Sequence, residues 1–427
     1  MASGGTVNGS GGDFATGPSG GIVNFTGSGT FSGNCNPYNV YIYGGVNFGI
    51  GTVTIQDGGA FRINAGGFAN INGPFYADGS TLQYNTGNGG SGYNRTLEWN
   101  SNTLNSRGYP SQVLISNNTA LNPARSDNNF SSTPLACKGN LTIESGSQFN
   151  LDQSGNYMTA DLEIGGNLVI EGQLAGSQNS GSDIVLQGNW TRSSTGNYFP
   201  NNRAVIFTGN GNTQTITKNG GDGKETFAYF IVNKPTGDVQ IAANTNVLVN
   251  GNSGGNNLQL LSGNIDLNGC SFEWGGTGNE GLQTTGGLRK IFSDSPATFR
   301  VSGGNRGVVP TLGGELEFDE QTRVIISAGI DFASFTTTIN ATLQIDGGGF
   351  VNPNAPIFGP ESKLIYNSGG PYSRNVEWGN NPIPGNPGYP WHVIVQGSTV
   401  LDLNSNSIAA SSLAIQGDLT IGNGSTT

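Results

Sequence analysis

Two stretches of this sequence hold the residues best suited to chemistry, and the two share one pattern. Each stretch reads Y-x-R-x-x-E-W and then G-Y-P. The first contains Tyr93, Arg95, Glu98, Trp99 and Tyr109, and the second contains Tyr372, Arg374, Glu377, Trp378 and Tyr389, followed by Trp391. A guanidinium in such a setting can lie against an aromatic ring and pair with the neighbouring carboxylate.

This doubled segment has two interpretations. In the structural one, which we favour, each copy is a long loop folded against the body of the protein and pinned by its aromatic rings. In that interpretation the loops pack against the body of the repeat through Arg95, Glu98, Arg374 and Glu377. In the functional one, the aromatic side chains form a platform on which a glycan stacks. The residues of that platform are Tyr93, Trp99, Tyr109, Tyr372, Trp378, Tyr389 and Trp391.

Carboxylates are the next candidates. In the run 315–320, strand alternation puts Glu315, Glu317 and Asp319 on one face. Two acids at a suitable separation can cleave a glycoside, but a solvated outer face explains the same alternation and is the interpretation we favour. Asp57 and Asp346, each followed by two glycines, could bind Ca²⁺. Turn formation accounts for both, so we predict no cofactor.

The histidine and the cysteines give weaker signals. His392 is the only histidine, and no serine nucleophile elbow accompanies it, so we expect a packed or surface side chain. Cys35, Cys137 and Cys270 are far apart and odd in number, which predicts neither a disulfide framework nor a metal site. We expect the three thiols to be buried as small apolar groups.

The elements that must position these residues are short apolar runs. In Leu141-Thr142-Ile143 and Leu168-Val169-Ile170, apolar residues stand at i and i+2, which is the period of a strand with one buried face. Glycine contributes 72 of 427 residues and charged residues only 11%, so helices are not expected. Brief strands, glycine and asparagine corners and the lack of a domain break predict an all-β parallel β-helix, that is, a β-solenoid.

Three corners share the phrase Gly-Asn-hydrophobe. Their asparagines are Asn140, Asn167 and Asn189. Glycine permits the bend, and the asparagine side chain can cap corner amides or form a ladder with the next turn. Asn140 and Asn189 also match glycosylation sequons, but the corner role explains the pattern without glycans.

The doubled segment belongs to an internal repeat. Leu82 and Leu364 are 282 residues apart, and Gly139 and Gly417 are 278 apart. We therefore predict the end of one repeat unit at 1–81, a complete unit at 82–363 and the start of the next at 364–427, all in one continuous solenoid. The chain reads as a segment of a longer protein whose leader and anchor lie elsewhere.

The bulk properties exclude some functions. A net charge of −11 and a pI near 4.5 oppose nucleic-acid binding, which needs a basic face. No apolar run approaches the ~20 residues that a membrane-crossing helix needs. The N-terminus lacks the charged and apolar regions of a signal peptide.

Several phrases carry a family resemblance. They are GNLTIESGSQFNL, GGNLVIEGQL, GNWTRSSTGNYFPNNRAVIFTGNGNTQTI, ETFAYFIVNK and LQLLSGNIDLNG. These resemble the very large β-strand-repeat or adhesin-like proteins that Bacteroidota export to their surface by type IX secretion. The likeness is clearest over residues 82–270 and 364–421.

The resemblance implies a β-solenoid stalk at the bacterial cell surface, with adhesive or anchoring modules elsewhere in the chain. We therefore expect a structural, non-catalytic stalk segment of an extracellular adhesin. The expected partners are other segments of the same very large chain, surface glycans, or further copies joined end to end into a filament. The alternative is a carbohydrate-binding or polysaccharide-degrading β-helix module, either a glycoside hydrolase or a polysaccharide lyase.

Overall fold

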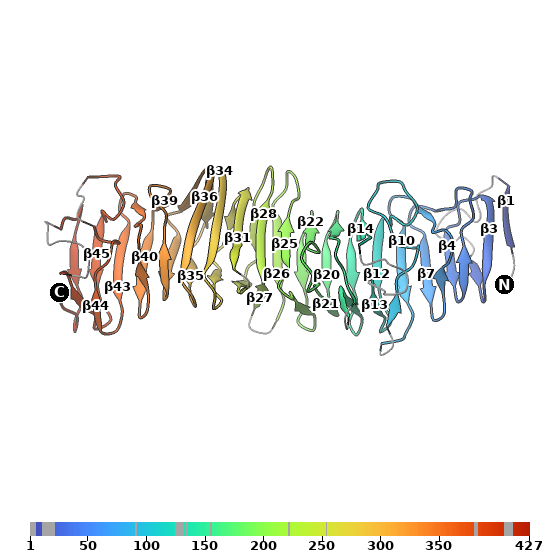
Figure 1. The fold of residues 1–427 in the computed structure, drawn as a ribbon, viewed down its shortest axis with the longest axis horizontal. Helices are drawn as coiled ribbons and strands as arrows, with labels where there is room; N and C mark the ends of the chain where they lie inside the picture. Colours follow the sequence, from blue (N-terminus) through green and yellow to red (C-terminus); the bar gives the residue numbers. More distant parts are fainter. Residues whose placement is uncertain are drawn as a thin grey trace. The chain divides into compact units, whose positions relative to one another are not determined.

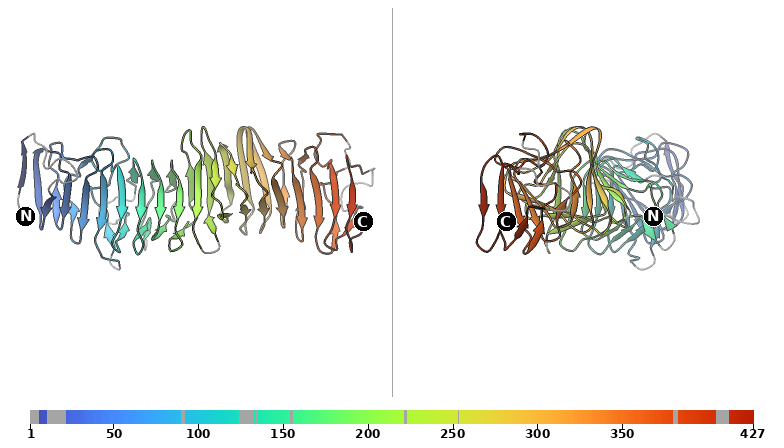
Figure 2. Two further views of the ribbon diagram at one scale, coloured as in Figure 1. Left: turned by 180° about the vertical axis from the view of Figure 1, so that it is seen from behind. Right: turned by 60° about the vertical axis from the view of Figure 1, so that its left-hand side comes forward.

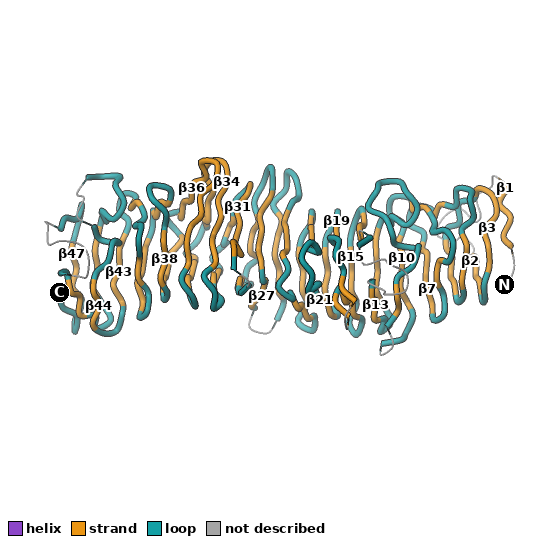
Figure 3. The backbone as a smooth tube through the Cα atoms, in the orientation of Figure 1, coloured by secondary structure: helices purple, strands orange, loops and turns teal. Residues whose placement is uncertain are grey.

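The computed structural model describes residues 6–10, 22–89, 92–123, 132–133, 135–153, 156–220, 223–252, 254–379, 383–404 and 413–427. In this part of the chain every regular element is a strand, and the parallel strands stack in a β-solenoid of about 15 turns (Figure 3). The predicted fold class is therefore confirmed. No helix long and apolar enough to cross a membrane occurs among the described residues.

The chain forms two compact units, Met1–Ile206 and Phe207–Thr427. Their boundary falls inside the repeat unit predicted at 82–363, and β25 (Ala204–Phe207) ends there. Each unit contains one copy of the doubled segment, so the two copies can be compared residue by residue.

In the first unit, successive turns contribute one strand each to long parallel ladders (Figure 1). The main ladder contains β2 (Ile22–Phe25), β4 (Asn39–Ile42), β7 (Ala60–Asn64), β10 (Thr81–Asn85), β12 (Gln112–Ile115), β15 (Leu141–Ile143), β20 (Leu168–Ile170) and β23 (Trp190–Arg192). A second contains β14 (Leu135–Cys137), β19 (Leu162–Ile164) and β22 (Ile184–Leu186), and a third contains β11 (Tyr93–Asn94), β13 (Ala120–Asn122), β16 (Gln148–Asn150), β21 (Gln173–Ala175) and β24 (Asn197–Phe199). Shorter sheets are formed by β1 (Thr6–Ser10), β3 (Gly29–Asn34), β5 (Gly45–Asn47) and β8 (Phe68–Ala69), by β6 (Thr54–Ile55) with β9 (Phe75–Tyr76), and by the antiparallel pair β17 (Asp152–Gln153) and β18 (Asn156–Tyr157).

The second unit has the same construction, seen from behind in Figure 2. Its nine-stranded sheet is β27 (Lys224–Phe227), β30 (Asn246–Val249), β33 (Ser271–Trp274), β35 (Ala297–Val301), β37 (Thr322–Ile326), β40 (Thr342–Asp346), β43 (Lys363–Asn367), β45 (His392–Val395) and β47 (Leu419–Ile421). The other ladders contain β26 (Gln214–Lys218), β28 (Tyr229–Asn233), β29 (Val239–Ile241), β31 (Gly255–Ser262), β32 (Ile265–Asp266), β34 (Glu280–Phe292), β36 (Arg306–Phe318), β38 (Gly329–Asp331), β39 (Thr337–Ile339), β41 (Phe350–Val351) and β42 (Ile357–Phe358), with β44 (Pro371–Ser373) pairing β46 (Val400–Asp402).

The register of the ladders builds the core. Leu141 stands opposite Leu168, and Phe272 opposite Phe299, so like side chains stack from turn to turn. The Phe272 and Phe299 rings are 5.5 Å apart and nearly parallel. A one-residue slip would move every apolar side chain of a strand to the outer face, which is why the alternation in the sequence determines the register.

The corner asparagines connect neighbouring turns. The carboxamide oxygen of Asn140 accepts a hydrogen bond from the backbone N–H of Asn167 at 2.8 Å, and that of Asn167 accepts one from the N–H of Asn189 at 2.8 Å. The turns approach so closely here that a Cβ on Gly188 would overlap the backbone of Gly166. Glycine is therefore required at this corner for lack of space.

We predict that Gly188→Ala lowers the free energy of unfolding by roughly 1–3 kcal/mol, because the backbone of the neighbouring turn must move. Gly370→Ala is the matched control, since nothing lies within 4 Å of the added carbon and its φ is ordinary. Urea denaturation followed by circular dichroism measures both. Equal midpoints for the two variants would contradict the close approach of the turns at Gly188.

Candidate functional site

The first copy of the doubled segment is a loop sealed by buried polar groups. The loop leaves β10, passes through β11 and returns to β12. The Trp99 side chain is fully buried and donates its indole N–H to the Ala136 carbonyl at 2.8 Å. The Arg95 guanidinium is also buried and donates to the Trp99 carbonyl at 2.9 Å and the Pro123 carbonyl at 3.2 Å. Burial lowers the pKa of Arg95 to about 10.

Glu98 is the acceptor at the centre of this loop. Its Oε1 accepts hydrogen bonds from the Tyr84 hydroxyl at 3.3 Å, the Tyr93 hydroxyl at 3.2 Å and the Thr96 backbone N–H at 2.8 Å. The Thr96 hydroxyl donates to Oε2. Burial raises the pKa of Glu98, and the hydrogen bonds from Thr96 oppose this rise. Burial, and then the carboxylate, raise the pKa of both tyrosines well above its usual value.

The second copy repeats this arrangement with one difference. Oε1 of Glu377 accepts from the Tyr366 hydroxyl at 3.3 Å, the Tyr372 hydroxyl at 3.2 Å and the Asn375 backbone N–H at 2.9 Å. Asn375 stands where the first copy has Thr96, and Oε2 of Glu377 is buried with no hydrogen-bond partner among the residues that the structure describes. Burial raises the pKa of Glu377 to about 7, with these hydrogen bonds acting against it.

The remaining residues of the second copy match the first. The Arg374 guanidinium donates to the Trp378 carbonyl and, at 3.2 Å, to the Leu403 carbonyl. The Trp378 indole N–H donates to the Ala414 carbonyl at 3.0 Å. In both copies the arginine therefore binds backbone carbonyls of the folded loop.

These positions correct part of the glycan-platform prediction. Trp99 is 0% exposed and Trp378 is 4% exposed, so neither indole offers a face to a sugar. In both copies the indole N–H binds a backbone carbonyl of the following turn, which holds the ring in the interior. The other predicted platform residues are Tyr93, Tyr109, Tyr372, Tyr389 and Trp391, and all five are partly buried. The hydroxyls of Tyr93 and Tyr372 bind the buried glutamates.

We predict a pH dependence of stability that depends on Glu377. Its folded-state pKa lies above the ordinary value of 4.5, so the folded protein binds the proton more tightly than the unfolded chain. The stabilisation is present below pH 4.5 and is lost as the pH rises through about 7, by on the order of 3 kcal/mol.

The measurement compares urea unfolding of the wild type, Glu377→Gln and Asn375→Thr from pH 4 to 8. Glu377→Gln reduces the slope to what other groups with a raised pKa, such as Glu98, contribute. Asn375→Thr supplies the hydroxyl donor that Glu98 has, and thus flattens the slope. Parallel pH profiles for all three proteins would show that Glu377 does not titrate in this window.

The other sequence candidates lie in surface ladders and turns. Glu317 pairs with Lys290 at 2.7 Å, Asp319 accepts from the Thr322 hydroxyl at 2.6 Å, and Glu315 is exposed. The structure thus places Glu317 and Asp319 in contacts between and within turns.

Of the two aspartates considered for calcium, Asp57 lies in a turn and Asp346 in β40, and His392 lies in β45. Asp346 accepts from Gln344 at 2.6 Å and Asn367 at 2.9 Å, while the Asp57 carboxylate lies against Gly79. His392 accepts from the Asp418 backbone N–H at 3.0 Å. Among the described residues, no group of three or more His, Cys, Asp or Glu side chains is placed to hold a metal ion. The three cysteines are free; Cys35 and Cys137 are buried, and Cys270 is partly buried.

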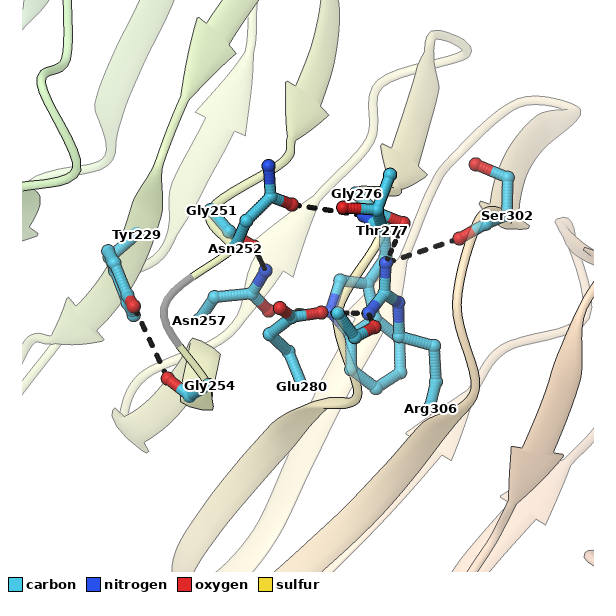
Figure 4. Close-up of polar contacts among 12 residues, drawn as sticks. Tyr229, Gly251, Asn252, Gly254, Asn257, Gly276, Thr277, Glu280, Ser302 and Arg306 are labelled. Atoms are coloured by element: carbon cyan, nitrogen blue, oxygen red, sulfur yellow. Dashed lines mark hydrogen bonds and ion pairs between the residues drawn. The ribbon is translucent and has the colours of Figure 1, made fainter.

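A third buried polar cluster, also in the second unit, is missed by the sequence predictions (Figure 4). The Arg306 guanidinium binds the Glu280 carboxylate, and both side chains are fully buried. Arg306 also donates to the Gly278 carbonyl at 2.5 Å and the Gly276 carbonyl at 2.8 Å. Burial lowers the pKa of Arg306, and the Glu280 carboxylate opposes this shift. The guanidinium lies 5.7 Å from the centre of the Trp274 ring.

The Trp274 ring is fixed in turn by Asn257 of β31. Its indole N–H donates to the Asn257 side chain at 2.7 Å, and Asn257 donates to the Gly251 carbonyl at 3.2 Å. The sequence does contain a signal for the cluster. Gly278-Asn279-Glu280-Gly281 recurs 26 residues later as Gly304-Asn305-Arg306-Gly307, with the charge reversed.

An open pocket of about 440 Å³ lies next to this cluster. It is lined by Gly255, Asn256, Asn279, Glu280, Gly281, Asn305, Arg306, Gly307, Val309 and Asp331. The Glu280 and Arg306 side chains are fully buried, so the accessible groups are the backbone and the asparagine, aspartate and valine side chains. A second pocket, of about 380 Å³, lies in the same unit between Glu320 and Lys363.

We predict that Glu280→Gln destabilises the protein by roughly 3–5 kcal/mol, because the buried Arg306 charge loses its partner. In the double variant Glu280→Leu with Arg306→Met, both charges are absent and a large part of the loss is recovered. Lys290→Gln, which breaks the half-exposed pair with Glu317, is the control and costs less than about 1 kcal/mol. Thermal unfolding measures all three. A double variant no more stable than Glu280→Gln would contradict direct coupling of the pair.

Comparison of this sequence with protein-family models, with curated proteins and with solved structures finds no match.

Proposed function

We propose that this chain is a structural, non-catalytic stalk segment of a large bacterial cell-surface adhesin. The observation that supports the proposal most is the nine-stranded sheet from β27 to β47, to which successive turns of the second unit each add one parallel strand (Figure 1). At ~4.8 Å per strand, eight intervals of this sheet span roughly 40 Å. Such a ladder lengthens by the same increment with every added turn.

The buried loop clusters give further support. The longest connections of each repeat, which precede β12 and β45, are tied to the body by Arg95 and Trp99 or by Arg374 and Trp378. Arginine and tryptophan side chains often form binding surfaces, but here they fix the loop to the body of the solenoid. A stalk that holds a distant module in place needs this rigidity, because each turn of a solenoid contacts only its neighbours.

The cellular setting in the proposal comes from the resemblance to Bacteroidota surface proteins. It implies an extracellular location and export by type IX secretion, with other segments of the same very large chain as partners. The acidic surface agrees with such a setting, because it opposes non-specific binding to nucleic acid.

The test replaces this segment in the organism that carries it. We expect an in-frame deletion of these 427 residues to reduce adhesion while the protein still reaches the surface. An unrelated β-solenoid with a similar number of turns should restore adhesion, because a stalk contributes extension and stiffness. Antibody labelling of intact cells controls for export.

Two outcomes of this experiment would contradict the proposal. The first is that adhesion is restored only by this segment's own sequence, which would make the segment a binding module. The second is the release of reducing sugars from surface polysaccharides by the purified chain, which would make it an enzyme.

A further inference from the structure

The pocket beside Arg306 crosses consecutive turns of the second unit. In the parallel register, Gly281 of β34 stands opposite Gly307 of β36, and Gly307 stands opposite Asp331 of β38. Two neighbouring turns thus have no side chain at the same position of the ladder, and the next turn has a carboxylate there. The missing side chain at Gly307 leaves open space in the pocket, whereas the Asn256 amide oxygen occupies the space over Gly281.

Gly307 is not required by packing. An added Cβ would meet only the Cβ of Asp331, at 3.9 Å, and the φ of Gly307 is ordinary. Glycine within a strand is unfavourable, because it lacks a side chain to pack and loses more entropy on folding. At Gly188 a clash explains the glycine, whereas at Gly307 the effect of glycine is to keep the pocket open.

The pocket walls present groups that suit neutral hydroxyls. The amide oxygen of Asn256 lies over Gly281, and its nitrogen donates to Gln283 at 2.9 Å. Asn279, Asn305 and Asp331 add further donors and acceptors. Among the lining residues only Arg306 is cationic, and its guanidinium is fully buried. The accessible charge is therefore the Asp331 carboxylate, which disfavours anionic ligands.

The cluster beneath the pocket holds these walls in position. Arg306 binds the carbonyls of Gly276 and Gly278, in the corner that leads to Asn279. It also binds the Ser302 carbonyl at 3.3 Å, in the corner that leads to Asn305. Figure 4 shows the guanidinium with its contacts to Gly276 and Ser302. One buried guanidinium thus fixes both corners that carry the pocket asparagines, so the site is formed before any ligand arrives.

We propose that this pocket binds a neutral pyranose sugar on the side of the solenoid. The volume of about 440 Å³ lies within the usual range for small-molecule sites. The amides and the Asp331 carboxylate bind ring hydroxyls, and Val309, which is 37% exposed, supplies the apolar contact for the sugar's C–H groups. This binding role differs from the aromatic platform considered for the doubled segment and does not depend on the stalk proposal.

The experiment is saturation-transfer NMR on the 427-residue chain with the methyl glycosides of glucose, galactose, mannose and N-acetylglucosamine, each at millimolar concentration. We expect at least one of them to bind. Methyl glucuronide is the anionic comparison and should bind more weakly than methyl glucoside, because of the Asp331 carboxylate.

The decisive variant is Gly307→Val, which fills the pocket and suits a strand. We expect it to weaken sugar binding at least tenfold without lowering thermal stability. Gly307→Ala, with its single ordinary contact, should show a smaller loss and keeps the test valid if valine disturbs the strand. Gly370→Val, at an open position that does not line the pocket, is the matched control and should bind like the wild type.

Three outcomes would overturn the proposal. They are the absence of transfer to all four neutral glycosides, undiminished binding by the stably folded Gly307 variants, and stronger binding of the glucuronide than of the glucoside.

Discussion

Backbone hydrogen bonds between parallel strands of successive turns determine where every other group in this protein lies. Because each turn pairs with the one before it, equivalent positions of neighbouring turns are only ~4.8 Å apart. This closeness accounts for three otherwise unrelated observations. Gly188 must be glycine, the carboxamide oxygen of Asn167 reaches the N–H of Asn189, and Phe272 stacks on Phe299. Each is a consequence of the register.

The same ladder explains how charged groups can be buried in this fold. Arg95 and Arg374 satisfy carbonyls that a loop lying on a solenoid would otherwise leave without partners, and Arg306 does the same at two corners. A guanidinium has several donors in a fixed geometry, so one residue can connect several backbone segments. The glutamates differ more than the arginines, because Oε2 of Glu98 accepts a hydrogen bond from the Thr96 hydroxyl, whereas Oε2 of Glu377 has no partner in the described part of the chain.

The fold was predictable from the sequence, but the surroundings of several side chains were not. The alternation in Leu141–Ile143 and Leu168–Ile170 encodes strands with one buried face, and constant glycine and asparagine corners favour stacked turns. The surroundings of Arg95 and Trp99 do not follow from strand alternation. Only Tyr93–Asn94 is a strand, and the chain turns before Trp99, so the period of two does not extend to it.

The pairing of Glu280 with Arg306 needed information that alternation does not contain. Two residues 26 positions apart become neighbours only when the length of that turn is known, and turn lengths vary along this chain. The pocket could not be predicted from the sequence for a related reason. Gly281 and Gly307 look like other corner glycines in a sequence with 72 of them, and their meaning depends on which residues face them across the ladder.

The two copies of the doubled segment also show where the chain tolerates a change in length. β10 and β43 both have five residues, and β12 and β45 both have four, yet the offset between the copies falls from 282 at Leu82 to 279 at Trp99. The connections therefore differ in length between the two copies, whereas these strands keep their lengths. Leu104, which is 56% exposed, lies in one of these connections. A foreign peptide grafted there would be presented on a rigid support, which makes the loop a natural starting point for a display scaffold.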